Sequence, residues 1–341
     1  MRISHPFSII ALWLVMAFSA AGPLVHRTAA AETAKPLVVF IGPIPALDPV
    51  WMADAQGYFK EAGLDVQLRT FPSGTTALQT FKTGAGDIVY NGDLPGVSYW
   101  ANTGRDYRIV AINDRDAKGY TAMARNAIKT PQDLKGKTIA TRVGSTGSWF
   151  ISVFLAKNGL KPTDVTVKNL DTQVLPIALC KGDIDGFFIW QPFGQRASEI
   201  CPKEVHELST AEGYIDGYGM FGVRPQWLAQ PANRDKLVRF LRALVKGKAY
   251  AKSHLDAVIA YGKEKYGVSA ELTRFSMKTA ETPIGFDPLF YKDFCSLSAW
   301  MQQQRLLTAP IDFSQLIDAG PLRQIGAKYD NMPAMACKPA S

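Results

Sequence analysis

Apolar and polar positions along the first two thirds of the chain follow two alternating periods. Short apolar runs typical of buried strands are each followed by a longer segment with helical spacing. In the first third the predicted strands are 37–42, 66–71, 87–92 and 107–114, and the predicted helices are 50–63, 73–84 and 94–104. Ser73 is a predicted N-cap, and glycines end the helical segments.

The middle third repeats this arrangement. Predicted strands 137–144, 165–170 and 185–190 alternate with predicted helices 145–158, 171–182 and 192–201. A Gly-Asp-Ile triplet marks the last helix-to-strand step of each unit, starting at Gly86 and at Gly182. Alternation of this kind builds parallel sheets with right-handed crossovers. The sequence therefore predicts an α/β fold with two lobes.

The last third is almost wholly helical, from about 234 to 329, and it brings no strand set of its own. We expect it to pack on the sheet of the first lobe. The chain would then cross between the lobes near 113–120 and again near 214–223, and two crossings make a hinge with a cleft. This assigns residues 32–117 plus 224–341 to lobe 1 and residues 118–223 to lobe 2.

The first 31 residues have the pattern of a secretory signal peptide. Arg2 precedes an apolar run over 7–21, and Ala29 and Ala31 have the spacing of a signal-peptidase site. No later segment approaches the roughly 20 apolar residues that span a bilayer. We expect the mature chain to be a soluble periplasmic protein, with an uncleaved anchor as the alternative.

Charge and cysteine content narrow the possible functions. The formal net charge is 38 − 30 = +8, and loss of Arg2 and Arg27 leaves 36 − 30 = +6, which suits an anionic ligand. No basic run with interleaved aromatics indicates nucleic-acid binding. Four cysteines remain in an oxidising compartment, at spacings that fit no metal motif. Of three possible connectivities, Cys180–Cys201 and Cys295–Cys337 close the shortest loops, and we expect those two.

Open parallel sheets bind ligands beyond the carboxyl ends of their strands. The strand-to-helix loops there are 42–51, 71–75, 91–95, 144–149, 170–172 and 190–192. Most contain residues that cap helices, namely Ser73, Asp93, Ser145 or Thr146, and Asp171. Either these residues only cap, or several helix N-termini, each with roughly half a positive charge, converge on a small anion. Gly144 would permit a close approach of the backbone.

Aromatic residues flank the same loops: Trp51, Trp149, Phe150, Trp190 and Tyr218. Each belongs either to the core or to a pocket wall; we assign Phe150 to the core and keep both options for Trp149 and Trp190, which lie at helix starts. Arg142 either meets an anion or forms a surface ion pair. Asp93 would repel an anion, so it is either a cap or the partner of an amine on a zwitterionic ligand.

Catalytic motifs are absent from the sequence. It has no Gly-x-Ser-x-Gly elbow, Walker loop, GxGxxG or His-Glu-x-x-His. Only His206 and His254 follow the signal segment, both in polar contexts. We therefore expect a binding protein without a cofactor or metal, and no enzyme.

Four segments resemble a known family. GYFKEAGLDV (57–66), FPSGTTALQTFKTGAGDIVYNGDLP (71–95), TPQDLKGKTIATRVGST (130–146) and GDIDGFFIWQPF (182–193) are similar to the substrate-binding proteins of ABC importers for nitrate, taurine and alkanesulfonates. The wider group includes thiamine-pyrimidine binders. The resemblance implies a type II periplasmic binding protein, with two α/β lobes joined by a two-strand hinge and a ligand cleft between them.

The resemblance also implies a set of ligand-binding residues. Carried over loop by loop, they are Trp51, Ser73, Gly74, Asn91, Gly92, Asp93, Ser145, Thr146, Trp190, Gln191 and Tyr218, and their positions in the loops add Gly144 and Trp149. Many relatives have an acidic residue where Gln191 stands. The neutral amide weakens the inference of a cationic ligand group at that point.

The implied function is ligand capture for an importer. The protein would bind a small organic anion, such as a sulfonate or taurine, by hinge closure and deliver it as a monomer to an inner-membrane ABC permease. Nitrate or a pyrimidine or other aromatic ligand is the alternative cargo. An enzyme on the same fold, or a sensing subunit for a signalling partner, is the alternative activity.

Overall fold

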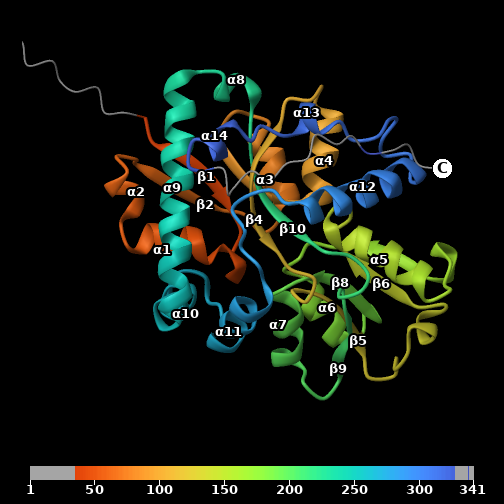
Figure 1. The fold of residues 1–341 in the computed structure, drawn as a ribbon. Coiled ribbons are helices and arrows are strands. Elements are labelled where there is room, and N and C mark those ends of the chain that lie inside the picture. The colour runs from red at the N-terminus through yellow and green to blue at the C-terminus, as the bar shows by residue number, and fades with distance from the viewer. Residues whose placement is uncertain (1–34, 327–336, 338–341) are drawn as a thin grey trace, which may run out of the picture. The chain divides into compact units, whose positions relative to one another are not determined.

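The first lobe is built on a five-stranded mixed sheet. The computed structural model describes residues 35–326 and Cys337, so the predicted signal segment 1–31 lies outside the described residues. The strand order is β2-β1-β3-β10-β4, with β1 Leu37–Ile41, β2 Val66–Thr70, β3 Ile88–Gly92, β4 Arg108–Arg115 and β10 Tyr218–Val223 (Figure 1). Strand β1 pairs in parallel with β2 and β3, whereas β10 is antiparallel to both β3 and β4.

The second lobe repeats this sheet with the order β7-β6-β8-β5-β9. Its strands are β5 Tyr120–Arg125, β6 Thr138–Thr141, β7 Thr166–Asn169, β8 Gly186–Trp190 and β9 Val205–Thr210. Strand β5 is antiparallel to β8 and β9. The prediction of purely parallel sheets is therefore wrong, because in each lobe one strand from a segment next to a lobe crossing enters the sheet in the opposite direction. Strands β5 and β9 were not predicted.

The helices of the first lobe follow the predicted order with one interruption. They are α1 Asp48–Ala55, α2 Tyr58–Glu61, α3 Gly74–Phe81 and α4 Asp93–Asn102, with a 3₁₀ turn, η1 Pro45–Leu47, before α1. The single helix predicted over 50–63 is two helices. Gly57 separates them with a φ of +71°, a left-handed conformation that ends α1.

The second lobe contains α5 Thr146–Lys157, α6 Leu175–Lys181 and α7 Phe193–Ile200, with 3₁₀ turns η2 Pro131–Leu134 and η3 Pro162–Asp164. Helix α5 begins after its predicted cap, Ser145. Helix α6 begins four residues later than predicted, with Val174 at its N-cap position. Asp171 is therefore not a cap, and it pairs with Arg142 instead.

The C-terminal third packs on the first lobe, as predicted. Its helices are α8 Pro225–Leu228, α9 Pro231–Ser253, α10 Leu255–Tyr266, α11 Ala270–Thr279, α12 Pro288–Gln303, α13 Phe313–Leu316 and α14 Gly320–Arg323. The rings of Phe240 on α9 and Phe59 on α2 stack at 5.4 Å, and Ile317 bridges to Ile109 of β4. The long amphipathic run predicted as one segment breaks at His254, between α9 and α10.

The chain passes between the two sheets twice. Residues 116–119 connect β4 to β5, and residues 211–217 connect β9 to β10. The sequence predicts crossings near 113–120 and 214–223, so the second crossing begins three residues before its predicted segment. The second lobe ends before β10, however, because Tyr218–Val223 belongs to the first sheet rather than to the second.

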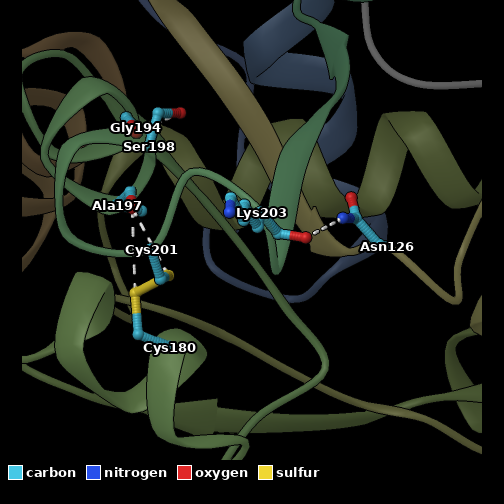
Figure 2. The surroundings of a disulfide bond; sticks show 7 residues. All are labelled: Asn126, Cys180, Gly194, Ala197, Ser198, Cys201 and Lys203. Atoms are coloured by element: carbon cyan, nitrogen blue, oxygen red, sulfur yellow. Dashed lines mark hydrogen bonds between the residues drawn. A yellow bond between two sulfur atoms is a disulfide. The ribbon is translucent and has the colours of Figure 1, made fainter.

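Two disulfides have the predicted pairing, Cys180–Cys201 and Cys295–Cys337. The first joins the ends of α6 and α7, as Figure 2 shows, near the turn where the Asn126 side chain donates to the Lys203 carbonyl. The chain-entropy model gives such a loop about 3 kcal/mol of stabilisation. Within residues 35–326, no helix combines the length and the hydropathy needed to cross a membrane.

Candidate functional site

A cavity of about 60 Å³ lies where strand ends of both lobes meet. Residues of the first lobe that line it include Pro72, Ser73, Gly74, Thr75, Tyr90, Asn91, Gly92, Asp114 and Asp116; residues of the second include Tyr120, Ser145, Thr146, Trp190 and Gln191. Leu272, Phe275 and Ser276 of α11 complete the wall. At 10–15 Å³ per water, this space holds about four to six waters, so it suits a small solute.

Three helix N-termini come together at this cavity. A Cβ on Gly74, the first residue of α3, would lie 2.9 Å from the Cα of Asn91, and a Cβ on Gly92, before α4, would lie 2.7 Å from the Thr146 hydroxyl of α5. Glycine is needed at both positions because any side chain would separate these segments. Each helix start has roughly half a positive charge, so the three together favour an anionic group.

The predicted serine caps are confirmed. Ser73 Oγ accepts a hydrogen bond from the Thr76 N–H at 3.2 Å, and Ser145 Oγ accepts one from the Gly147 N–H at 3.2 Å. Their side chains therefore satisfy helix donors, while other donors stay open to the cavity. In the described part of the chain, neither Gly74 nor Thr75 donates its N–H to a protein acceptor.

Thr75 adds an unpaired hydroxyl to the same wall. Its Oγ1 is buried and has no hydrogen-bond partner among the described residues, although Thr75 lines the cavity. Buried polar atoms are nearly always paired, so this hydroxyl is a candidate ligand contact. It was not among the residues that the resemblance implicated.

Asp93 links the lobes and does not line the cavity. It is the first residue of α4, whose N-cap is Gly92, so the prediction of Asp93 as the cap is corrected. Its Oδ1 accepts from the Leu94 N–H and from the Thr146 hydroxyl, both at 2.6 Å, and its Oδ2 accepts from the Tyr218 N–H at 3.1 Å. Burial raises the pKa of Asp93 to about 6, against the lowering effect of these hydrogen bonds.

Two further carboxyl groups do line the cavity. Asp114 is the next-to-last residue of β4 and Asp116 begins the first crossing, and each residue is 7% exposed. Burial raises the pKa of Asp114 to about 7 and that of Asp116 to about 6, and the negative charge of Asp116 contributes to the raised pKa of Asp114. No Lys, Arg or His lines the cavity in the described part of the chain.

Arg142 is engaged elsewhere. Its guanidinium pairs with Asp171 at 3.0 Å within the second lobe, and it does not line the cavity. Of the two alternatives for this residue, the structure supports the ion pair. An anion in the cavity therefore depends on backbone N–H groups, hydroxyls and helix dipoles.

Aromatic side chains supply much of the remaining wall. The rings of Trp190 and Tyr120 meet edge to face at 6.5 Å, and Tyr90 and Phe275 also line the cavity. Gln191 lies beside Trp190, and its Oε1 accepts from the Gln195 N–H of α7 at 3.0 Å. The cavity thus combines polar helix starts with rings that suit a ligand with carbon atoms.

Eight of the thirteen predicted site residues line the cavity. They are Ser73, Gly74, Asn91, Gly92, Ser145, Thr146, Trp190 and Gln191. The other five lie outside it, and Asp93 is described above. Gly144 has a φ of +81°, which favours glycine, and no protein atom lies within 4 Å of a Cβ placed there.

The three remaining aromatic residues belong to the protein interior. Trp51 is fully buried and stacks on Tyr266 at 5.0 Å. Trp149 packs against Trp300 at 6.5 Å. Tyr218 lies at the predicted return crossing, but its hydroxyl donates to Asp293 of α12. Their side chains contact residues of the C-terminal helices. The position of these three residues beside predicted loops does not indicate such distant partners.

The sequence interpretation missed Tyr90, Asp114, Asp116, Tyr120 and the α11 residues. The predicted crossing at 113–120 contains both aspartates and Tyr120, so its place at the hinge is a usable signal for these three residues. The α11 contacts come from a segment about 150 residues away along the chain from β5 and had no local signal. No group of three or more potential metal ligands occurs among the described residues.

Comparison with known proteins agrees with this architecture. A family model described as NMT1/THI5 like matches residues 45–258. A putative binding protein of Brucella abortus (strain 2308) is 30% identical over 167 residues, which is 48% of this chain and 50% of that protein. The chain thus spans about half the length of the curated relatives that it matches at this identity.

Two further matches cover more of the chain. The taurine-binding periplasmic protein of Escherichia coli (strain K12) is 26% identical over 240 residues, 60% of this chain and 75% of that protein. The structure of the alkanesulfonate-binding protein SsuA from Xanthomonas axonopodis pv. citri, bound to MOPS, has a TM-score of 0.69 at 20% identity and covers 84% of this chain and 98% of that chain. This likeness shows the two-lobed fold of a periplasmic binding protein.

Proposed function

The chain belongs to the NMT1/THI5-like family, and from this premise we propose that it is the substrate-binding component of an ABC importer. It captures a small organic solute with an anionic group, of the sulfonate class, between its two lobes. It then delivers the solute to a membrane permease. Export to the periplasm is part of the same proposal.

The convergence of three helix N-termini carries this proposal. Helices α3 and α4 of the first lobe and α5 of the second begin at one cavity, so an anion there contacts both lobes at once. A ligand that contacts both lobes stabilises the arrangement in which they are together. Helix starts bind anions through free N–H groups and the helix dipole.

The relatives support the choice of a sulfonate. The Escherichia coli relative is named as a taurine-binding protein and the Xanthomonas structure as an alkanesulfonate-binding protein. The aromatic rings of Tyr90, Tyr120 and Trp190 on the cavity wall favour a ligand with a carbon chain over a bare inorganic anion. We further propose that the ligand leaves unchanged, without chemical turnover.

Thr75→Ala tests the anion site without removing a helix cap. The purified protein is unfolded and refolded to remove bound solute, and sulfonate binding is measured by calorimetry. Loss of one neutral hydrogen bond, about 0.5–1.5 kcal/mol, raises the Kd about two- to twelvefold. Nuclear magnetic resonance of the ligand after long incubation tests for turnover.

Thr80→Ala is the matched control on the same helix. Thr80 does not line the cavity, so its replacement should leave the Kd unchanged. Equal affinities of the wild type and both variants would remove the α3 start from the binding site. Absence of binding for every sulfonate, with tight binding of nitrate or an aminopyrimidine, would contradict the proposed ligand class.

A further inference from the structure

The charged side chains of the cavity wall are all acidic. Asp114 and Asp116 line the cavity, and the described residues contribute no cationic side chain to it. A wall with this charge opposes an anion that approaches it, because two like charges in a partly dehydrated site repel each other strongly. A ligand that was only an anion would gain nothing from this part of the cavity.

Asp114 has an oxygen that the protein does not use. Both of its hydrogen bonds in the described part of the chain end on Oδ1, one from the Tyr90 hydroxyl at 2.7 Å and one from the Asn113 side-chain amide at 2.9 Å. The side chain is 93% buried and lines the cavity. The other oxygen, Oδ2, accepts no hydrogen bond from the described residues, so a donor on a ligand would add one.

Asp116 is better satisfied and adds charge. Its Oδ1 accepts from the Gly119 N–H at 2.8 Å, and its Oδ2 lies 3.5 Å from the Thr279 hydroxyl. The phenol rings of Tyr90 and Tyr120 line the same cavity. Aromatic faces attract cations, so these neighbours favour the same kind of ligand group as the two carboxylates.

We propose that Asp114, supported by Asp116, forms a subsite for a protonated amine, so that the ligand is a zwitterion with an ammonium group as well as a sulfonate. This inference rests on the proposed function, because the sulfonate binds at the helix starts. The ammonium group donates to the unused oxygen of Asp114. Its positive charge also offsets the repulsion between the two carboxylates. The cavity therefore prefers a ligand with an amine to one without.

Taurine and ethanesulfonate distinguish this subsite from the anion site. The two ligands share the sulfonate and the two-carbon chain and differ in the amine. The refolded wild type should bind taurine at least about tenfold more tightly, the value of one hydrogen bond to a charged group. Asp114→Asn should lose that preference while its Kd for ethanesulfonate stays equal or falls.

Asp256→Asn is the matched control, because Asp256 on α10 is 97% exposed. It should bind both ligands as the wild type does. Equal affinity of the wild type for the two sulfonates would overturn the ammonium subsite and leave the proposed function intact. Failure of both sulfonates to bind would overturn the proposed function and the subsite with it.

Proton release provides a test that needs no variant. Calorimetric titration of the wild type at pH 7, in two buffers of different ionisation enthalpy, counts the protons exchanged on binding. Taurine should release a fraction of a proton, because burial raises the pKa of Asp114 to about 7 and its carboxyl group becomes fully ionised beside the ammonium. Release of the same number of protons by ethanesulfonate would contradict the subsite.

Discussion

Buried carboxyl groups set the pH behaviour of the first lobe. Burial raises the pKa of Asp48 to about 8, of Asp93 to about 6, of Asp114 to about 7 and of Asp116 to about 6. Asp48 lies outside the cavity wall; the charge of Asp114 raises the pKa of Asp48 further, and Lys248 partly offsets this effect. Each group binds its proton more tightly in the folded chain than in the unfolded one.

The ligand-free protein should therefore lose stability as the pH rises from 5 to 8. The pKa values of these groups are raised on folding, so their stabilising contribution is complete below pH 4 and disappears as the pH passes 6 to 8. Each proton of difference between the two states changes the free energy of unfolding by about 1.4 kcal/mol per pH unit. Thermal melts across this range measure the effect.

Asp114→Asn should flatten this pH dependence, since one of the titrating groups is removed. Asp48, Asp93 and Asp116 still titrate in this range, so part of the slope remains. A melting temperature that rises between pH 5 and 8 would show that these carboxyl groups are ionised and paired in the folded chain.

At the scale of elements, two glycines distinguish contacts within a lobe from contacts between lobes. A Cβ on Gly74 meets the backbone Cα of Asn91 at 2.9 Å, and both residues belong to the first lobe. A Cβ on Gly92 meets the Thr146 hydroxyl at 2.7 Å, which belongs to the second lobe. Only the second overlap can be relieved by separating the lobes.

Gly92→Ala should therefore weaken ligand binding and leave folding stability nearly unchanged. We expect a rise in Kd of at least about tenfold, because about 1.4 kcal/mol of overlap opposes the closed arrangement. Gly92 has a φ of −76°, which alanine adopts without strain. Calorimetry gives the affinity, and thermal melting of the ligand-free protein gives the stability.

Gly74→Ala is the comparison, and it should lower the free energy of unfolding by about 1–3 kcal/mol, the usual cost of overpacking. If Gly92→Ala destabilised the ligand-free protein as much as Gly74→Ala does, the lobes would be in fixed contact and would not separate.

Local patterns predicted most elements and failed where partners come from elsewhere in the chain. Helix α5 and the Ser73 and Ser145 caps follow from a few neighbouring residues. Choosing the pairing with the shortest loops predicted both disulfides correctly. Strands β5 and β9 were missed. Each completes a sheet whose other strands are distant in sequence, so their pairing has no local signal.

At the scale of the whole molecule, the lobes are joined by the packing of Trp149 against Trp300 and by individual hydrogen bonds. The Thr146 hydroxyl donates to Asp93 at 2.6 Å, the Gln195 amide to the Ser269 hydroxyl at 2.6 Å and the Thr172 hydroxyl to the Pro72 carbonyl at 3.3 Å. Hydrogen bonds of this kind contribute about 1 kcal/mol each. A ligand that contacts both lobes can therefore shift the balance between open and closed arrangements.

The sequence interpretation identified the polar half of the site and missed the acidic half. Strand-to-helix loops identify Ser73, Gly74, Gly92, Ser145 and Thr146, because sheets present such loops at one edge. The acidic wall, formed by Asp114 and Asp116, depends on how β4 enters the first crossing. The remaining wall depends on where α11 packs. Both depend on the tertiary fold.

A crystal structure of the refolded protein with taurine tests the central claim most directly. We expect the sulfonate oxygens within hydrogen-bond distance of the N–H groups of Gly74 and Thr75 and of the α5 start at Thr146, and the amine beside Asp114. A sulfonate bound away from all three helix starts, or held by a surface arginine, would contradict the account.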